Sequence, residues 1–139
     1  MSAKDADVLL IPCSGIGKVH GLIGREAVLQ AVDTLSEDVA DTLCLALLVM
    51  GDDEALEAVR TRRCITVDGC PKLCAFKNVE LGGGRIVGSV RVVDAVKSHK
   101  GIQPGTATNL TEGGWTIVAD LASTLMDEVR KARAEGEKE

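Results

Sequence analysis

The chain has 139 residues, the length of one ordinary domain with room for a substantial hydrophobic core. Its net charge is −5 and its isoelectric point is near 5.1, which argues against nucleic acid or an anionic membrane as a partner, because both favour a basic protein surface. Phe76 and Trp115 are the only aromatic residues, so stacking platforms for bases are missing and the core must be aliphatic.

The polar segment 1–7 leads into an apolar run that is too short to span a membrane or to act as a targeting signal. We therefore expect a cytoplasmic protein with no membrane partner. The chain contains five cysteines. In an intracellular protein these are expected to be thiols, metal ligands or catalytic groups rather than a disulfide framework, and their odd number agrees with this.

Val8 to Pro12 form a continuous apolar run, which predicts a strand buried on both faces. From Ile23 to Leu35 apolar residues recur at helical spacing, and this pattern predicts the first crossover helix. A glycine-rich turn connects the two. It contains Cys13, Ser14, Gly15, Gly17 and Lys18.

Leu43 to Met50 is almost unbroken aliphatic sequence, and it predicts a central parallel strand with Cys44 inside it as a core residue. Asp52 or Asp53 is then expected to cap a helix from Glu54 to about Thr61.

Cys64 to Val67 predicts a third strand, which delivers Asp68 and Cys70 at its carboxyl end. Pro71 suits the first position of a helix, which makes Cys70 the N-cap and places Cys74 one turn further on.

That helix is expected to stop at the glycines of residues 82–84, and Ile86 to Val93 predicts a fourth strand. Thr111 begins a long C-terminal helix. Its apolar stripe is expected to contain Trp115, Val118, Ala122, Leu125, Val129 and Ala132.

Three successive strand–helix units imply a parallel sheet with right-handed crossovers. We therefore predict a single α/β domain over residues 1–139, small, doubly wound and Rossmann-like. It has about four mostly parallel strands with flanking helices and a long C-terminal helix.

Cys13 ends the first predicted strand and Cys70 follows the third, so both belong to the sheet edge where open α/β folds bind ligands. If these strands are neighbours, their ends lie roughly 5 Å apart and the sulfurs of Cys13, Cys70 and Cys74 converge. Three thiolates with one further ligand suit zinc, and three with an open corner suit an iron–sulfur cluster. The residues alone do not choose between the two.

Four residues are candidates for a fourth ligand, with solvent as the alternative. Asp52 and Asp68 are predicted at strand ends, although each is also explained as a helix cap or turn residue. His20 suits a ligand or a general base. Cys64 is disfavoured, because six residues of strand place it about 20 Å from Cys70.

The segment from Ser14 to Lys18 does not match a phosphate-binding loop, because Pro12 occupies the first glycine position and Val19 follows the lysine. Glycine N–H groups beside a lysine nevertheless suit a small anionic ligand. The candidate residues for binding such a ligand or a cofactor are Ser14, Gly15, Gly17, Lys18 and Asp68.

The runs Asp68-Gly69-Cys70 and Cys74-Ala75, with Lys77 and with Cys13-Ser14-Gly15, resemble the DGC-domain family of zinc-binding proteins. The resemblance covers roughly residues 8 to 81. It implies a zinc site more than it implies a known activity. The family is described by four cysteines, and the fourth is not evident in this sequence.

Two classes of function follow from these residues. The first is a metal-binding protein in which Cys13, Cys70 and Cys74 are the ligands. The second is a thiol enzyme or persulfide sulfur carrier, in which Cys70 or Cys74 reacts and Cys13 resolves the intermediate. The sequence leaves open the substrate, the oligomeric state, and whether a metal is catalytic or structural.

Overall fold

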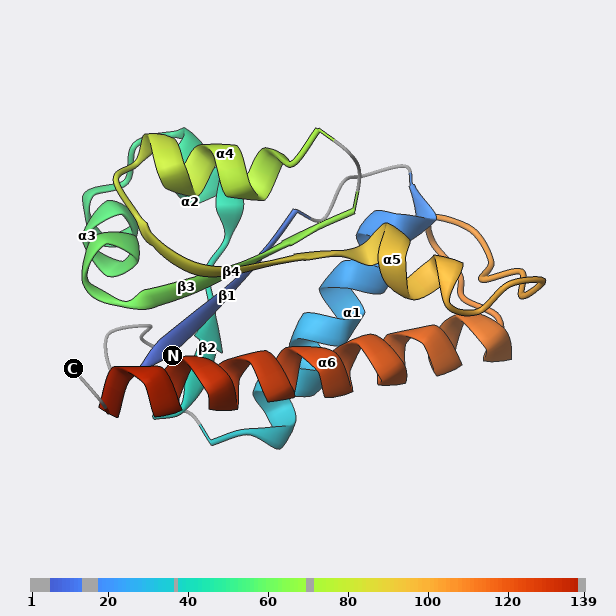
Figure 1. The fold of residues 1–139 in the computed structure, drawn as a ribbon. Helices are drawn as coiled ribbons and strands as arrows, with labels where there is room; N and C mark the ends of the chain where they lie inside the picture. Colours follow the sequence, from blue (N-terminus) through green and yellow to red (C-terminus); the bar gives the residue numbers. More distant parts are fainter. Residues whose placement is uncertain (1–5, 14–17, 37, 70–71, 138–139) are drawn as a thin grey trace.

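The computed structural model describes residues 6–13, 18–36, 38–69 and 72–137. These residues form a single sheet with helices on both sides (Figure 1). The elements in chain order are β1 (Val8–Cys13), α1 (Val19–Thr34), β2 (Ala40–Thr42), α2 (Leu45–Val49), α3 (Asp53–Thr61), β3 (Arg63–Asp68), α4 (Cys74–Leu81), β4 (Arg85–Arg91), α5 (Val92–Lys97) and α6 (Glu112–Glu137).

The described strands form a four-stranded sheet in the order β2-β1-β3-β4, and all three pairings are parallel. This confirms the predicted α/β class. The strands β1 and β3 occupy the centre of the sheet. All four strands therefore end at one edge, here called the carboxyl edge, and β1 and β3 end there side by side.

The sheet is covered on both faces (Figure 1). One face packs against α1, α5 and α6, and the other packs against α2, α3 and α4. The chain moves from β1 to β2 in one direction and from β2 through β3 to β4 in the other. Crossovers of one handedness then require helices on opposite faces, as the doubly wound prediction expects.

Successive side chains of β1 pack on opposite faces of the sheet, which explains why the strand is apolar at every position. Val8 and Leu10 belong to the cluster shared with α1 and α6, whereas Leu9 and Ile11 belong to the cluster shared with α2, α3 and α4. All four side chains are fully buried. A strand with two covered faces needs no polar positions, which is why the alternating pattern of a half-buried strand is absent from this run.

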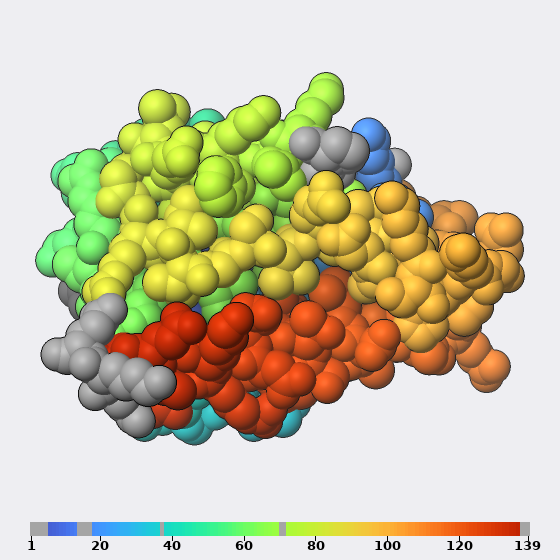
Figure 2. Space-filling view, viewed as in Figure 1, coloured from blue at the N-terminus to red at the C-terminus, as the bar shows by residue number. Residues whose placement is uncertain are grey.

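The long helix α6 runs along one side of the molecule for most of its length (Figure 2). Five residues of its predicted stripe are buried, together with Ile117 and Leu121, which the prediction did not include. Trp115 was placed wrongly, because its side chain is 44% exposed near the start of the helix. No helix within the described parts of the chain is long and apolar enough to cross a bilayer.

The prediction of a central strand from Leu43 to Met50 is wrong. The strand in this region is β2, which has three residues, lies at a sheet edge and ends at Thr42. The aliphatic run instead forms the short helix α2, in which Leu48 is the one buried residue. Leucine, alanine and methionine favour helices, and a short apolar run is ambiguous between a buried strand and a helix.

Two helix starts also differ from the prediction. The first turn of α1 begins at Val19, so His20 lies inside the helix rather than in the preceding loop. The helix predicted from Pro71 begins at Cys74, which is therefore its first residue and not one turn inside it. The predicted N-cap role of Cys70, and Pro71 itself, lie outside the described residues.

Candidate functional site

The carboxyl edge brings two predicted site residues together. Cys13 and Asp68 are register partners at the ends of β1 and β3, so their Cα atoms lie about one strand spacing apart, roughly 5 Å. Strand alternation places both side chains on the α4 face, because Ile11 and Cys64 already belong to that cluster. The strand order reverses between β1 and β3, which is where open α/β sheets bind ligands.

Asp68 is buried, with 1% of its surface exposed, and its carboxylate meets the start of α4. The N–H of Ala75 donates to Asp68 Oδ1 at 2.7 Å, and the N–H of Phe76 donates to Oδ2 at 3.2 Å. Burial raises the pKa of Asp68, while these two hydrogen bonds and the positive charge of Lys77 act in the opposite direction. The capping explanation for Asp68 is confirmed.

Gly69 lies against the first turn of α1. A Cβ atom at this position would stand 3.2 Å from the backbone nitrogen of Gly21 and 3.2 Å from the carbonyl carbon of His20. Both contacts are with backbone atoms, which move less readily than the end of a side chain. The absence of a side chain at Gly69 therefore lets β3 and α1 approach each other at the carboxyl edge.

We expect Gly69→Ala to lower the free energy of unfolding by about 1–2 kcal/mol. The added methyl group overpacks the contact with α1, and this cost is larger than the stabilisation gained because alanine reduces the entropy of the unfolded chain. Gly88→Ala in β4 is the control, since its Cβ would make ordinary contacts with Ile65 at 3.4 Å and beyond. Urea unfolding of both variants measures the difference. Equal stabilities for the two variants would contradict the close approach described here.

Cys13 and Cys74 are both partly buried, and each lies at the carboxyl edge. None of the four cysteines that the structure describes is in a disulfide. Cys70, Ser14, Gly15 and Gly17 lie outside the described residues, so the convergence of the three predicted sulfurs stays a prediction. Across residues 6–13, 18–36, 38–69 and 72–137, no three His, Cys, Asp or Glu side chains are placed to hold a metal ion.

A family model for the DGC domain matches residues 9–131. The chain belongs to the DGC domain family. The match extends well past residue 81, where the recognisable motifs end, and includes α5 and most of α6. The long C-terminal helix is therefore part of the DGC domain and not an appended segment. Searches among curated proteins and among solved structures gave no match.

The remaining candidate ligands of the DGC domain occupy different places. Asp52 follows α2 rather than a strand, which corrects its predicted position, and its carboxylate caps α3 by accepting the N–H of Ala55 at 2.9 Å. His20 is partly buried in the first turn of α1, near Gly69. Lys18 is exposed at the N-cap position of α1, and Cys64 is fully buried at the start of β3.

Sequence reasoning missed Cys44, which was predicted to be a core residue of a strand. In the structure Cys44 is exposed at the N-cap position of α2, two residues after the end of β2. Because β2 pairs with β1, this position belongs to the same carboxyl edge as Cys13. A helix assignment for the aliphatic run would have revealed it.

The thiol of Cys64 gives the DGC domain a pH-dependent stability. Its burial raises its pKa from 9.0 to about 12, against an opposing hydrogen bond with the backbone of Arg85. The folded state therefore keeps this proton where the unfolded chain releases it, so the contribution of Cys64 to stability falls as pH rises above about 9.

We expect the advantage of wild type over Cys64→Ala to shrink by up to about 1.4 kcal/mol for each pH unit above this point. Urea unfolding at several values between about pH 8 and pH 11 measures it, with the other titrations cancelling in the comparison. Parallel stability curves for the two proteins would contradict the buried location of the thiol.

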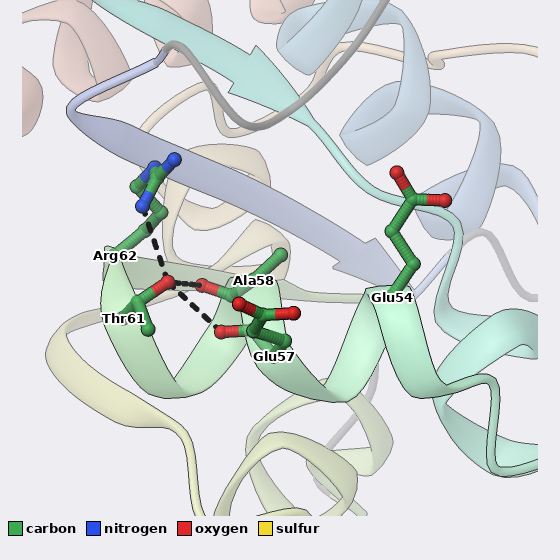
Figure 3. Close-up of a pocket in the computed structure, with 5 residues that line it drawn as sticks. All are labelled: Glu54, Glu57, Ala58, Thr61 and Arg62. Carbon is green, nitrogen blue, oxygen red and sulfur yellow. Dashed lines mark hydrogen bonds between the residues drawn. The ribbon is translucent and has the colours of Figure 1, made fainter.

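Two cavities are lined by described residues of the DGC domain. One of about 300 Å³ lies along α3, where Thr61 and Arg62 mark the end of the helix that leads into the start of β3 (Figure 3). A second of about 280 Å³ lies between β4, α5 and α6. The described residues that line them include no cysteine, so neither cavity is the predicted thiol site.

Proposed function

We propose that this DGC domain binds a zinc ion through Cys13, Cys70 and Cys74 at the carboxyl edge. The observation that carries the proposal is the register of Cys13 with Asp68, the first residue of the Asp68-Gly69-Cys70 run, at the point where strand order reverses. That register brings two cysteine-containing segments, distant in sequence, to neighbouring strand ends. Thiolates are the ligands that structural and catalytic zinc sites share.

The charge around Asp68 favours a metal over an activated thiol nucleophile. A helix N-terminus activates a thiol when its positive potential and its N–H groups face the sulfur. In α4 two of those N–H groups already bind the Asp68 carboxylate. A cation suits a site that combines this negative charge with several thiolates.

The family's fourth cysteine has a structural candidate in Cys44, because it lies at the same edge and is exposed. If the fourth position holds water instead, zinc would supply a Lewis acid there, and the positive charge of Lys18 at the N-cap position of α1 would attract a small anionic substrate. The four described cysteines form no disulfide, which agrees with a reducing compartment such as the cytoplasm.

Elemental analysis of protein purified without oxygen tests the proposal. We expect one zinc per wild-type chain and loss of zinc in Cys13→Ser, Cys70→Ser and Cys74→Ser. Cys64→Ser is the matched control and keeps the metal, because Cys64 lies in the core at the start of β3. Cys44→Ser decides whether the fourth ligand is a thiolate.

Two results would overturn the zinc assignment. A brown protein with iron and sulfide in place of zinc would identify an iron–sulfur cluster on the same cysteines. Metal-free protein whose Cys70 is rapidly alkylated near neutral pH would identify a thiol enzyme or persulfide carrier.

A further inference from the structure

The start of α4 is capped from a distance. The residue before the helix is Leu73, which has a left-handed backbone with φ of 54° and no side-chain oxygen to bind the first N–H groups. An N-cap side chain normally comes from the residue directly before the helix. Here the acceptor is Asp68, which lies seven residues before Ala75 and eight before Phe76.

This arrangement joins the end of β3 to the start of α4. Asp68 is fixed in β3 by pairing with β1 and β4, and Cys74 is the first residue of α4. The Asp68 carboxylate ties the two ends together, one oxygen to each N–H. Gly69 adds a second anchor, because its backbone lies against the first turn of α1. Cys70 comes directly after both anchors.

We propose that Asp68 is a positioning residue of the DGC domain, which holds the start of α4, and with it Cys74, at the end of β3, where the register partner in β1 is Cys13. This inference rests on the proposed thiolate site and assigns Asp68 a role other than metal ligand. The carboxylate is buried and both of its oxygens already accept hydrogen bonds. Coordination of a metal by either oxygen would compete with a bond that holds α4.

Hydrogen exchange in the metal-free protein tests the pair of hydrogen bonds from Ala75 and Phe76 to Asp68, here called the Asp68 clamp. In Asp68→Ala we expect amide hydrogen exchange at Ala75 and Phe76 to accelerate about tenfold or more, because each N–H loses its acceptor. In Asp68→Asn the side-chain oxygen replaces one acceptor, so Ala75 keeps most of its protection and Phe76 loses it. Amides in the last turn of α4 are expected to exchange at the wild-type rate. Unchanged exchange at both Ala75 and Phe76 would overturn the proposal.

The matched control is Asp41→Asn, which changes a second buried carboxylate in the edge strand β2, separated from β3 by β1. Asp41 is 3% exposed and accepts the N–H of Thr42 at 2.8 Å, without reaching α4. We expect this variant to leave exchange at Ala75 and Phe76 unchanged. Acceleration there equal to that of Asp68→Asn would show a general loss of stability and would overturn the specific clamp.

The absorption spectrum of bound cobalt(II) shows whether Asp68 positions the cysteine ligands or is itself a metal ligand. We expect Asp68→Asn to keep the thiolate-to-cobalt absorption per metal and the d–d band positions of wild type, with affinity lowered about tenfold because Cys74 at the start of α4 is less well placed. Shifted d–d bands would show that the carboxylate is a ligand and would overturn the proposal. If wild type itself binds no cobalt, the proposed metal site fails, and hydrogen exchange alone still decides whether Asp68 is a clamp. If Asp68→Ala does not fold, Asp68→Asn decides both measurements.

Discussion

Zinc is expected to raise the free energy of unfolding of this DGC domain by about 4 kcal/mol when the free zinc concentration is about 1,000 times Kd. The reason is that the proposed ligands come from two segments distant in sequence, one ending at Cys13 in β1 and the other following Asp68 in β3, and these two strand ends are neighbours only in the folded state. The unfolded chain then binds zinc weakly, so the metal stabilises the folded state by mass action. Urea unfolding in a zinc buffer and in a chelator measures the difference.

Cysteine variants show whether the stabilisation comes from zinc bound at the proposed site or from zinc bound nonspecifically by thiols. Cys13→Ser is expected to lose most of the zinc-dependent increment, whereas Cys64→Ala keeps it although its baseline stability is lower. The comparison is informative because Cys13 lies at the carboxyl edge and Cys64 is buried at the opposite end of the neighbouring strand β3. Equal zinc increments in the two variants would contradict the assignment of Cys13.

Leu125→Ala is expected to lower the free energy of unfolding by about 3 kcal/mol, within the range of about 2–5 kcal/mol for buried leucines. Leu125 is fully buried in α6 and belongs to the cluster that joins α6 to α1 and the central strands β1 and β3. Truncation leaves a cavity at the interface that attaches the C-terminal helix to the sheet. Urea or thermal unfolding measures the loss.

Leu29→Ala is the matched control, because it removes the same atoms from a helix of the same layer. Leu29 is 48% exposed on α1 and is expected to lose less than about 1 kcal/mol. If the two variants are equally stable, α6 does not pack against the sheet as described. The family match through residue 131 would then cover a helix that is not part of the folded core.

The fold was largely predictable because its central strands carry unambiguous patterns. Val8 to Pro12 and Cys64 to Val67 are short β-rich runs bounded by polar or glycine-containing segments, and both are strands in the structure. Leu43 to Met50 is equally hydrophobic and is bounded in the same way, by Asp41-Thr42 and Gly51-Asp52, yet most of it forms α2. Its residues suit a helix at least as well as a strand, so hydrophobicity alone did not decide between the two.

Local sequence rules did not predict the start of α4 correctly. Pro71 follows the rule for a first helical position, yet the helix begins at Cys74 because its cap arrives from Asp68 in β3. A cap that is seven residues away depends on how the loop closes, and that is a property of the tertiary structure. The same is true of Gly69, whose contact with α1 has no signal in the sequence.

The candidate site was predictable in part. Cys13 and Asp68 were placed correctly at one edge because parallel strands end together and their strands are neighbours. The position of Cys44 was missed, since it depended on the wrong assignment of α2. Convergence of Cys13, Cys70 and Cys74 remains a prediction, because Cys70 lies outside the residues that the structure describes.

X-ray absorption at the zinc edge is the sharpest test of the proposed thiolate site, because it counts the sulfur atoms bound to the metal. We expect three or four sulfur neighbours at about 2.3 Å in wild-type protein, with one fewer in any Cys13→Ser protein that still retains zinc. A first shell made only of nitrogen and oxygen at about 2.0–2.1 Å would contradict it.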